Sequence, residues 1–439
     1  MNKLNALFSA VLIALTLAGC AQNPVSGQQD FVMMSEAQEI SLGRNADLDV
    51  RKQYKVYDHP ALQKYVNEIG QQVAKRSHRP NLQYRFTVLD SPEINAFALP
   101  GGYVYITRGI MAYLNSEAEL AAVLGHEVGH VTARHGVKQQ SAAQATSIGI
   151  SLASIFVPQL GTQLGQDISN LLGGALLSGY GRDHELEADR LGAQYLARTE
   201  YDPQAMIRVV GVLKNQELFD AEIAKQEGRE PRRYHGTFAT HPDNDTRLQQ
   251  VVGEASHLTV ANPKENKIEY LQQTTGMVFN DSVEEGIVRN NQFMHRDLGI
   301  TLKFPALWSV KNLPTQLVAL NAQNDASIQF KLDPKPTGSV VEYVRRLMGN
   351  SASIKAQDIG SQVAAIGSTD KTVIGVIYHG GQAFIIQGDA KTPQVFTAQR
   401  EAIEATIRSF RILSADERKQ IKPLTIQLTT AQSGDTYVK

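Results

Sequence analysis

The sequence predicts an α+β protein in which a mostly helical N-terminal domain precedes a smaller antiparallel α+β domain. Capped segments with helical spacing of apolar residues prevail up to residue 258, whereas short alternating segments prevail from residue 291. With 439 residues, the chain is long enough for two domains. The predicted parts are an apolar leader (1–19), a polar tether (20–30), the helical domain (31–258), a linker (259–290), the second domain (291–413) and a polar tail (414–439).

The first elements of the helical domain have clear start signals. Residues 35–38 form a capping box that opens a helix to about Gln53, and a second helix is expected from about Ala61 to Arg76. Residues 83–89 alternate like a strand. Pro100-Gly101-Gly102 is a turn signal followed by an alternating segment, so a hairpin is expected before the next helix.

That next helix is predicted over roughly 117–135 and contains His126-Glu127-Val128-Gly129-His130. Ser116 to Glu119 is a capping box, good helix formers follow, and His135-Gly136 suits a helix end. Two histidines four residues apart lie one turn apart on the same helix face, as two ligands of tetrahedral zinc require. Glu127 then lies where a general base can act on a water molecule.

A carboxylate third ligand is expected from Glu185-Leu186-Glu187-Ala188-Asp189, which begins 55 residues after His130. A helix capped by Asp183 and running to about Arg198 places Glu185 and Asp189 one turn apart on one face. We therefore predict that Glu185 binds the metal and that Asp189 accepts a hydrogen bond from the outer nitrogen of a ligand histidine. The alternative is a solvated acidic helix face, because Glu187 is charged too.

A third histidine ligand on the first helix is not expected. A metzincin continuation requires histidine at position 136, which is glycine here. His135 comes one residue early, and we interpret it as a surface histidine near the helix end.

These segments resemble the family-48 metallopeptidases, whose clan includes the CAAX prenyl endopeptidase and membrane heat-shock proteases of bacteria. The resemblance covers roughly 30–255, including Asn95-Ala96-Phe97-Ala98-Leu99-Pro100-Gly101-Gly102 and the strand after it. It implies a zincin-like (gluzincin) domain with one Zn²⁺ per chain. It also implies that Asn95 and Ala96 border the cleft and contact substrate backbone, with a plain hairpin as the alternative.

A further match is Thr240-His241-Pro242, followed by Arg247. The resemblance implies that His241 is catalytic, either stabilising the oxyanion or capping the open zinc position in a resting state. The alternative is a helix-start signal with Pro242 in the first turn. The family's Ser-Arg before the third ligand is Gly181-Arg182 here, so Arg182 is given no role.

The N-terminus resembles that of a bacterial lipoprotein. A basic start and an apolar core over residues 7–17 precede Leu17-Ala18-Gly19-Cys20, which resembles a lipobox. The resemblance implies cleavage before Cys20, its lipidation, and, because Ala21 rather than Asp follows, anchoring at the periplasmic face of the outer membrane. A signal peptide with a buried cysteine is the alternative. Cys20 is the one cysteine, so no internal disulfide can form.

Composition and hydropathy exclude other classes. The chain has 43 basic and 44 acidic residues, which leaves no electrostatic footprint for nucleic acid. Residues 147–161 are the most apolar stretch after the leader, but Pro158 interrupts them and they are shorter than the roughly 20 residues of a membrane span. We interpret them as apolar helices folding over the cleft, as a lid or as an ordinary core pair.

The second domain shows no catalytic constellation and weakly resembles small PsbP-like domains, so we interpret it as a substrate- or partner-binding module. Its strands are expected over 299–305, 307–310, 317–321, 326–332, 371–378 and 383–387, with helices near 338–349 and 398–410.

Together these features predict a zinc-dependent endopeptidase, for which family analogy suggests unfolded or misfolded envelope proteins as substrates. One alternative is a chaperone or outer-membrane assembly factor with a latent zinc site. Another is a structural zinc protein, against which the intact Glu127 argues, because such a site has no use for a general base.

Overall fold

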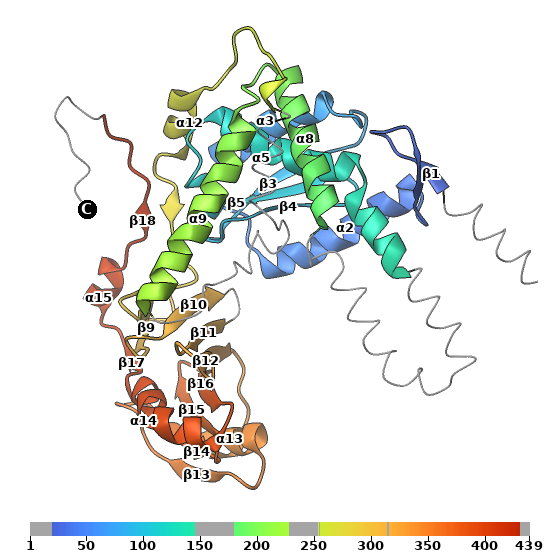
Figure 1. The fold of residues 1–439 in the computed structure, drawn as a ribbon. Helices are drawn as coiled ribbons and strands as arrows, with labels where there is room; N and C mark the ends of the chain where they lie inside the picture. The colour runs from blue at the N-terminus through green and yellow to red at the C-terminus, as the bar shows by residue number, and fades with distance from the viewer. Residues whose placement is uncertain (1–19, 145–179, 228–252, 254, 314–315, 431–439) are drawn as a thin grey trace, which may run out of the picture. The chain divides into compact units, whose positions relative to one another are not determined.

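The computed structural model describes residues 20–144, 180–227, 253, 255–313 and 316–430. Two compact units are present: the first comprises Met1–Leu218, Arg233–Met277 and Ile426–Lys439, and the second Phe219–Arg232 and Val278–Thr425. Helices dominate the first unit and antiparallel strands the second, so the predicted α+β class is confirmed (Figure 1).

The first unit is organised around a three-stranded sheet. Its strands are β3 (Arg85–Leu89), β4 (Ala96–Leu99) and β5 (Tyr103–Thr107), in the order β3-β5-β4. β5 runs parallel to β3 and antiparallel to β4, which leaves β4 at an edge of the sheet. The β4–β5 turn requires its glycines, because Gly101 and Gly102 have φ angles of 79° and 93°.

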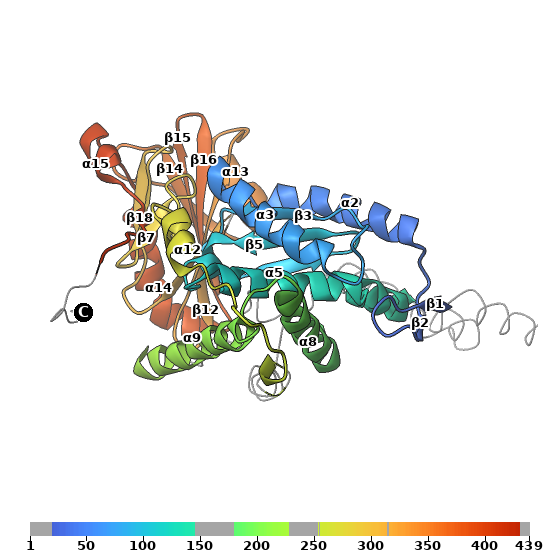
Figure 2. The same ribbon diagram turned by 90° about the horizontal axis from the view of Figure 1, so that it is seen from above.

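Helices cover both faces of this sheet. α2 (Glu36–Gln53), α3 (Pro60–Lys75), α4 (Arg108–Met111) and α5 (Glu117–Thr132) contact the sheet, whereas α8 (Arg182–Arg198) and α12 (Lys267–Thr274) pack on these helices. Val50 of α2 packs with Tyr103 and Tyr105 of β5. On the other face, α3 comes so close to Phe86 that a Cβ on Gly70 would lie 2.4 Å from the ring. α5 packs against α3, β4 and α8, and all of its residues are buried (Figure 2).

The predicted start of α5 is correct, but its predicted end is wrong. Ser116 accepts from the Glu119 N–H at 3.2 Å, whereas the Glu119 carboxylate accepts from the Asn115 N–H at 2.7 Å. The helix ends at Thr132, Arg134 has a φ of 56°, and the chain is helical again over 135–144. Arginine in the left-handed region is unfavourable without outside support.

A buried ion-pair cluster supplies that support. The Arg134 guanidinium donates from Nε to Glu39 at 2.9 Å and from Nη2 to the Met34 carbonyl at 3.0 Å. Arg79 donates to the same Glu39 carboxylate at 2.7 Å and to the Val131 carbonyl at 3.1 Å. Tertiary contacts from α2 therefore determine where α5 ends.

The segments predicted as a tether and a linker contain regular structure in the first unit, the linker as far as Met277. The segment 20–30 contains the hairpin of β1 (Cys20–Gln22) and β2 (Gln29–Phe31), and Asp30 pairs with Lys138 at 2.8 Å. Within 259–290, α12 packs on α3 and α5, and the Tyr270 hydroxyl donates to the Met111 carbonyl at 2.6 Å. Helix α9 runs from Ala205 to Glu227.

The second unit is built on a seven-stranded antiparallel sheet in the order β10-β11-β12-β16-β15-β14-β13. A four-stranded sheet has the order β17-β9-β8-β7, and β18 pairs with β6. The strands are β6 (Val278–Phe279), β7 (Ile287–Arg289), β8 (Gln292–His295), β9 (Ile300–Lys303), β10 (Ser309–Leu313), β11 (Gln316–Leu320), β12 (Ala326–Asp333), β13 (Ser353–Ala356), β14 (Ala364–Ser368), β15 (Thr372–His379), β16 (Gln382–Ala390), β17 (Arg411–Ile412) and β18 (Leu424–Thr425). The helices are α13 (Val340–Met348), α14 (Pro393–Arg408) and α15 (Ala415–Gln420).

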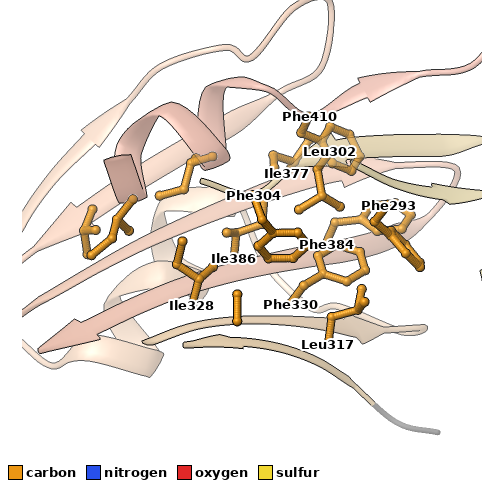
Figure 3. Packing of buried hydrophobic residues seen from close by; sticks show 14 of the residues in the cluster. Phe293, Leu302, Phe304, Leu317, Ile328, Phe330, Ile377, Phe384, Ile386 and Phe410 are labelled. Carbon is orange, nitrogen blue, oxygen red and sulfur yellow. The ribbon is translucent and has the colours of Figure 1, made fainter. Parts of the chain in front are cut away.

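Two apolar clusters cover the two faces of the large sheet. On one face, Phe293 and Leu302 of the small sheet pack with Phe330 and Phe384 (Figure 3). On the other, Val344 of α13 packs against alternate residues of β15 and β16. One helix therefore packs on each face of the large sheet, α14 on the first and α13 on the second. This matches the predicted arrangement of strands and flanking helices.

Among the described residues, no helix has both the length and the hydropathy that a bilayer crossing requires. Residues 147–161, interpreted above as apolar helices over the cleft, lie outside this part of the chain.

Candidate metal centre

The structure brings His126 and His130 of α5 together with Glu185 of α8. Glu185 lies 3.5 Å from each imidazole, Oε2 from Nε2 of His126 and Oε1 from Nε2 of His130, and the two Nε2 atoms are 2.9 Å apart. Four donors arranged tetrahedrally at zinc–ligand distances near 2.05 Å lie about 3.3 Å from each other. The three observed separations bracket that value, and all three residues are buried, so this donor set fits a zinc ion.

Small residues allow the two helices to come this close. A Cβ on Gly129 would lie 3.0 Å from the Ala188 carbonyl oxygen, and one on Gly192 would lie 3.0 Å from the His126 nitrogen. A Cβ on Gly125 would meet Gly192 at 3.4 Å. Gly129 of α5 and Gly192 of α8, unfavourable for an isolated helix, therefore permit the approach of α8 that brings Glu185 to the histidines.

Asp189 lies one turn after Glu185 and contacts the other side of His126. Its Oδ1 is 2.8 Å from Nδ1 of His126, and the carboxyl is fully buried. A proton on Nδ1 donates to Asp189 and leaves the lone pair of Nε2 directed at the metal position. This is the arrangement predicted for Asp189. The predicted helix cap is different: the N-cap of α8 is Gly181, and Asp183 lies within the first turn.

The interpretation of His135 as a surface residue is wrong. His135 is fully buried, and its Nδ1 lies 2.8 Å from Nδ1 of His130. Its Nε2 lies 3.1 Å from Oε2 of Glu187. Burial lowers the pKa of His135 to about 4, and the hydrogen bond to Glu187 opposes this shift. The reason for the error is the break at Arg134, which returns the chain toward His130.

Two further side chains adjoin the ligands. Glu127 is buried beside His126. The Tyr180 ring stacks on His130 with centroids 4.0 Å apart and an interplanar angle of 18°. Burial raises the pKa of Tyr180, and the Glu127 and Glu185 carboxylates raise it further. Tyr180 also lines a small pocket with His130, Leu99 and Pro100. Tyr180 was not predicted from the sequence, because only the fold brings its ring against that of His130.

Asn95 and Ala96 lie at the start of the edge strand. The Asn95 N–H donates to Thr107 Oγ1 at 3.0 Å, and its carbonyl accepts from the Thr107 N–H at 2.8 Å. Asn95 Oδ1 is buried and has no hydrogen-bond partner among the described residues. Ala96 pairs with Ile106 of β5. The hairpin alternative thus accounts for the backbone of Asn95 but not for its side chain.

Three other residues singled out from the sequence are not placed with this group. His241 and Arg247 lie outside the described residues, so the structure says nothing of their contacts. Cys20 is the first residue of β1.

Comparison with known proteins identifies one peptidase family and several related proteases. Residues 60–255 match the family described as Peptidase family M48. The beta-barrel assembly-enhancing proteases of Yersinia pestis and Escherichia coli K12 are 30% and 29% identical to this chain over 242 residues, which are 54% of this chain and 47% of theirs. The mitochondrial metalloendopeptidase OMA1 of Schizosaccharomyces pombe is 30% identical, over 42% of this chain and 54% of that protein.

The chain therefore spans about half the length of the curated relatives it matches. A solution structure of cyanobacterial PsbP from Synechocystis matches 29% of this chain and 94% of that one, at 11% identity and a TM-score of 0.23. That score supports no conclusion about the second unit. For the first unit, the family match coincides with the segment that contains both α5 and α8, and residues 60–255 are a domain of peptidase family M48.

Proposed function

We propose that this protein is a zinc-dependent endopeptidase. The observation that carries the proposal is the convergence of two imidazole nitrogens and one carboxylate, buried and 2.9–3.5 Å apart, beside the buried Glu127. His126, His130 and Glu185 would hold one Zn²⁺ and leave a coordination position open. When bound, the ion supplies Lewis acidity that polarises the scissile carbonyl and lowers the pKa of a coordinated water.

The protein's own groups carry the remaining steps. Glu127 accepts the proton of the attacking water and returns it to the leaving amine. Asp189 holds His126 in the tautomer that presents Nε2, because its carboxylate accepts the Nδ1 proton. The buried position of these groups excludes bulk water, which strengthens every charge interaction at the site.

We further propose that substrates bind in extended form along β4. An edge strand offers unpaired backbone groups to a peptide, and β4 is at the edge of its sheet. Asn95 supports this assignment, since its buried Oδ1 can accept a hydrogen bond from a substrate N–H. Ala96, the first residue of β4, would contact the substrate backbone next to it.

The proposed setting is the bacterial envelope. Cys20 would carry the lipid anchor, which places the protein at the periplasmic face of the outer membrane, and the substrates would be unfolded or misfolded envelope proteins. The names of the bacterial relatives, which join proteolysis to β-barrel assembly, support this setting. They also keep open a role in outer-membrane assembly with little proteolysis, in which His241 would cap the zinc of a latent site.

Glu127→Gln tests the peptidase. We expect zinc in both the wild type and the variant, and cleavage of unfolded casein about 10²–10⁴-fold slower in the variant, because only the proton acceptor is lost. Zinc in both with cleavage in neither would shift the assignment to the latent site, and His241→Ala would then be expected to release activity. Full activity in Glu127→Gln would remove Glu127 from the mechanism.

A further inference from the structure

We propose that His135 and Glu187 are positioning residues that fix the orientation and tautomer of the metal ligand His130. Each is one link of a chain that runs from Nδ1 of His130 through the His135 ring to Glu187 on α8. The inference rests on the proposed function, because it assumes that His130 binds zinc. It adds a support for the second histidine that corresponds to the support of His126 by Asp189.

Zinc binding by His130 determines where the protons lie in this series of hydrogen bonds. Zinc requires the lone pair of Nε2 of His130, so the ring proton is on Nδ1. That proton faces Nδ1 of His135 at 2.8 Å, so His135 must accept there and carry its own proton on Nε2. Nε2 of His135 in turn faces the Glu187 carboxylate at 3.1 Å. Every donor therefore meets an acceptor, in one arrangement of protons.

The backbone holds His135 in place from the opposite side. The left-handed conformation at Arg134, which Glu39 and the Met34 carbonyl support, returns the chain so that residue 135 begins the next helical segment beside His130. The His184 ring stacks on His135 with centroids 4.2 Å apart and an interplanar angle of 18°. The acceptor thus has a defined position and does not depend on a rotating surface side chain.

With this inference, each of the three acidic residues of the segment 185–189 of α8 has a role at the metal centre. Glu185 provides the ligand atom, Asp189 supports His126, and Glu187, between them in the sequence, supports His130 through His135. A single helix then orders all three ligands. The charge on Glu187, on which the alternative of a solvated acidic face depended, has a partner in the site.

Asparagine and glutamine at position 135 test this series of hydrogen bonds, because they place a side-chain amide at different distances from the backbone. The Asn amide lies near the place of Nδ1 and can accept from His130, whereas the Gln amide lies near the place of Nε2 and cannot. The zinc dissociation constant of the full chain is measured by competition with a chromophoric chelator. The visible absorption spectrum of the Co²⁺-substituted protein reports the ligand geometry.

We expect His135→Gln and His135→Ala to weaken zinc binding by about 10- to 100-fold, the usual loss when an outer partner of a metal ligand is removed. His135→Asn is expected to recover most of the wild-type affinity and the wild-type Co²⁺ spectrum. Glu187→Ala is expected to weaken binding as well, whereas Asp183→Ala, an exposed carboxylate on the same helix, is the control and changes nothing.

Equal zinc affinity in His135→Asn, His135→Gln and the wild type would overturn the inference while leaving the proposed function intact. Equal losses in the Asn and Gln variants would assign His135 to packing alone and overturn it as well. A wild-type protein that binds no zinc would instead overturn the proposed function, and the positioning role with it. Far-UV circular dichroism of each variant separates these results from misfolding.

Discussion

Gly129→Ala should separate zinc binding from folding. In the structure, the added methyl would lie 3.0 Å from the Ala188 carbonyl oxygen, 3.2 Å from the Ala188 Cα and 3.3 Å from the Leu191 Cβ. Two of these atoms belong to the backbone of α8 and cannot rotate away. Ordinary contacts begin near 3.4 Å, so α8 must move away from α5 by about 0.4 Å.

The effects on stability nearly cancel, whereas the effect on the metal does not. Alanine is favoured over glycine in a helix by about 1 kcal/mol, and overpacking costs about 1–3 kcal/mol. The net destabilisation is therefore about 0–2 kcal/mol. A displacement of about 0.4 Å, however, exceeds the roughly 0.2 Å tolerance of ligand distances and moves Glu185 away from both histidines. We expect zinc binding at least about tenfold weaker, equivalent to about 1.4 kcal/mol.

Gly125→Ala, one turn earlier on α5, is the matched control. Its methyl would meet Gly192 at 3.4 Å, an ordinary contact, so we expect the helix-propensity gain of about 1 kcal/mol and unchanged zinc affinity. The assays are chelator competition for zinc and the urea midpoint of the metal-free protein. Wild-type zinc affinity in Gly129→Ala would show that α8 accommodates the methyl without moving Glu185, and the argument from close approach would fail.

Two further predictions concern buried carboxylates. Glu39→Ala should destabilise the first unit by about 3–5 kcal/mol, because it leaves two buried guanidinium groups without their shared carboxylate; the control Glu36→Ala, whose side chain is 68% exposed, should cost less than about 1 kcal/mol in the same denaturation experiment. Asp189→Ala should weaken zinc binding by about 10- to 100-fold by removing the acceptor for His126 Nδ1, and an unchanged dissociation constant by chelator competition would refute its role.

Local signals predicted the elements that depend on local interactions. The capping box at Ser35 is present with both of its hydrogen bonds, and α2 ends at Gln53, where it was expected. The i, i+4 spacing in α5 and α8 predicted which side chains share a helix face, and the two motifs taken together predicted that His126, His130 and Glu185 converge. Whether the three ligands bind zinc stays a prediction until metal content is measured.

What the sequence did not reveal depends on tertiary contacts. Gly136 suits a helix end by propensity, yet the helix ends four residues earlier because Glu39, far away in the chain, stabilises Arg134 with positive φ. The same break buried His135, whose environment was therefore misjudged. The polar segment 259–290 was assigned as a linker, although α12 within it packs against α3 and α5.

The complete burial of α5 has a consequence for how variants of this protein would be scored. A substitution at almost any position of that helix disturbs the core that encloses it. The amount of the protein in the cell and its total catalytic activity would then fall together. A growth selection alone would assign functional importance to the whole helix, including Leu120 and Val128, which only fill space. Measuring protein level beside phenotype would leave His126, Glu127 and His130 as the positions where abundance persists and growth is lost.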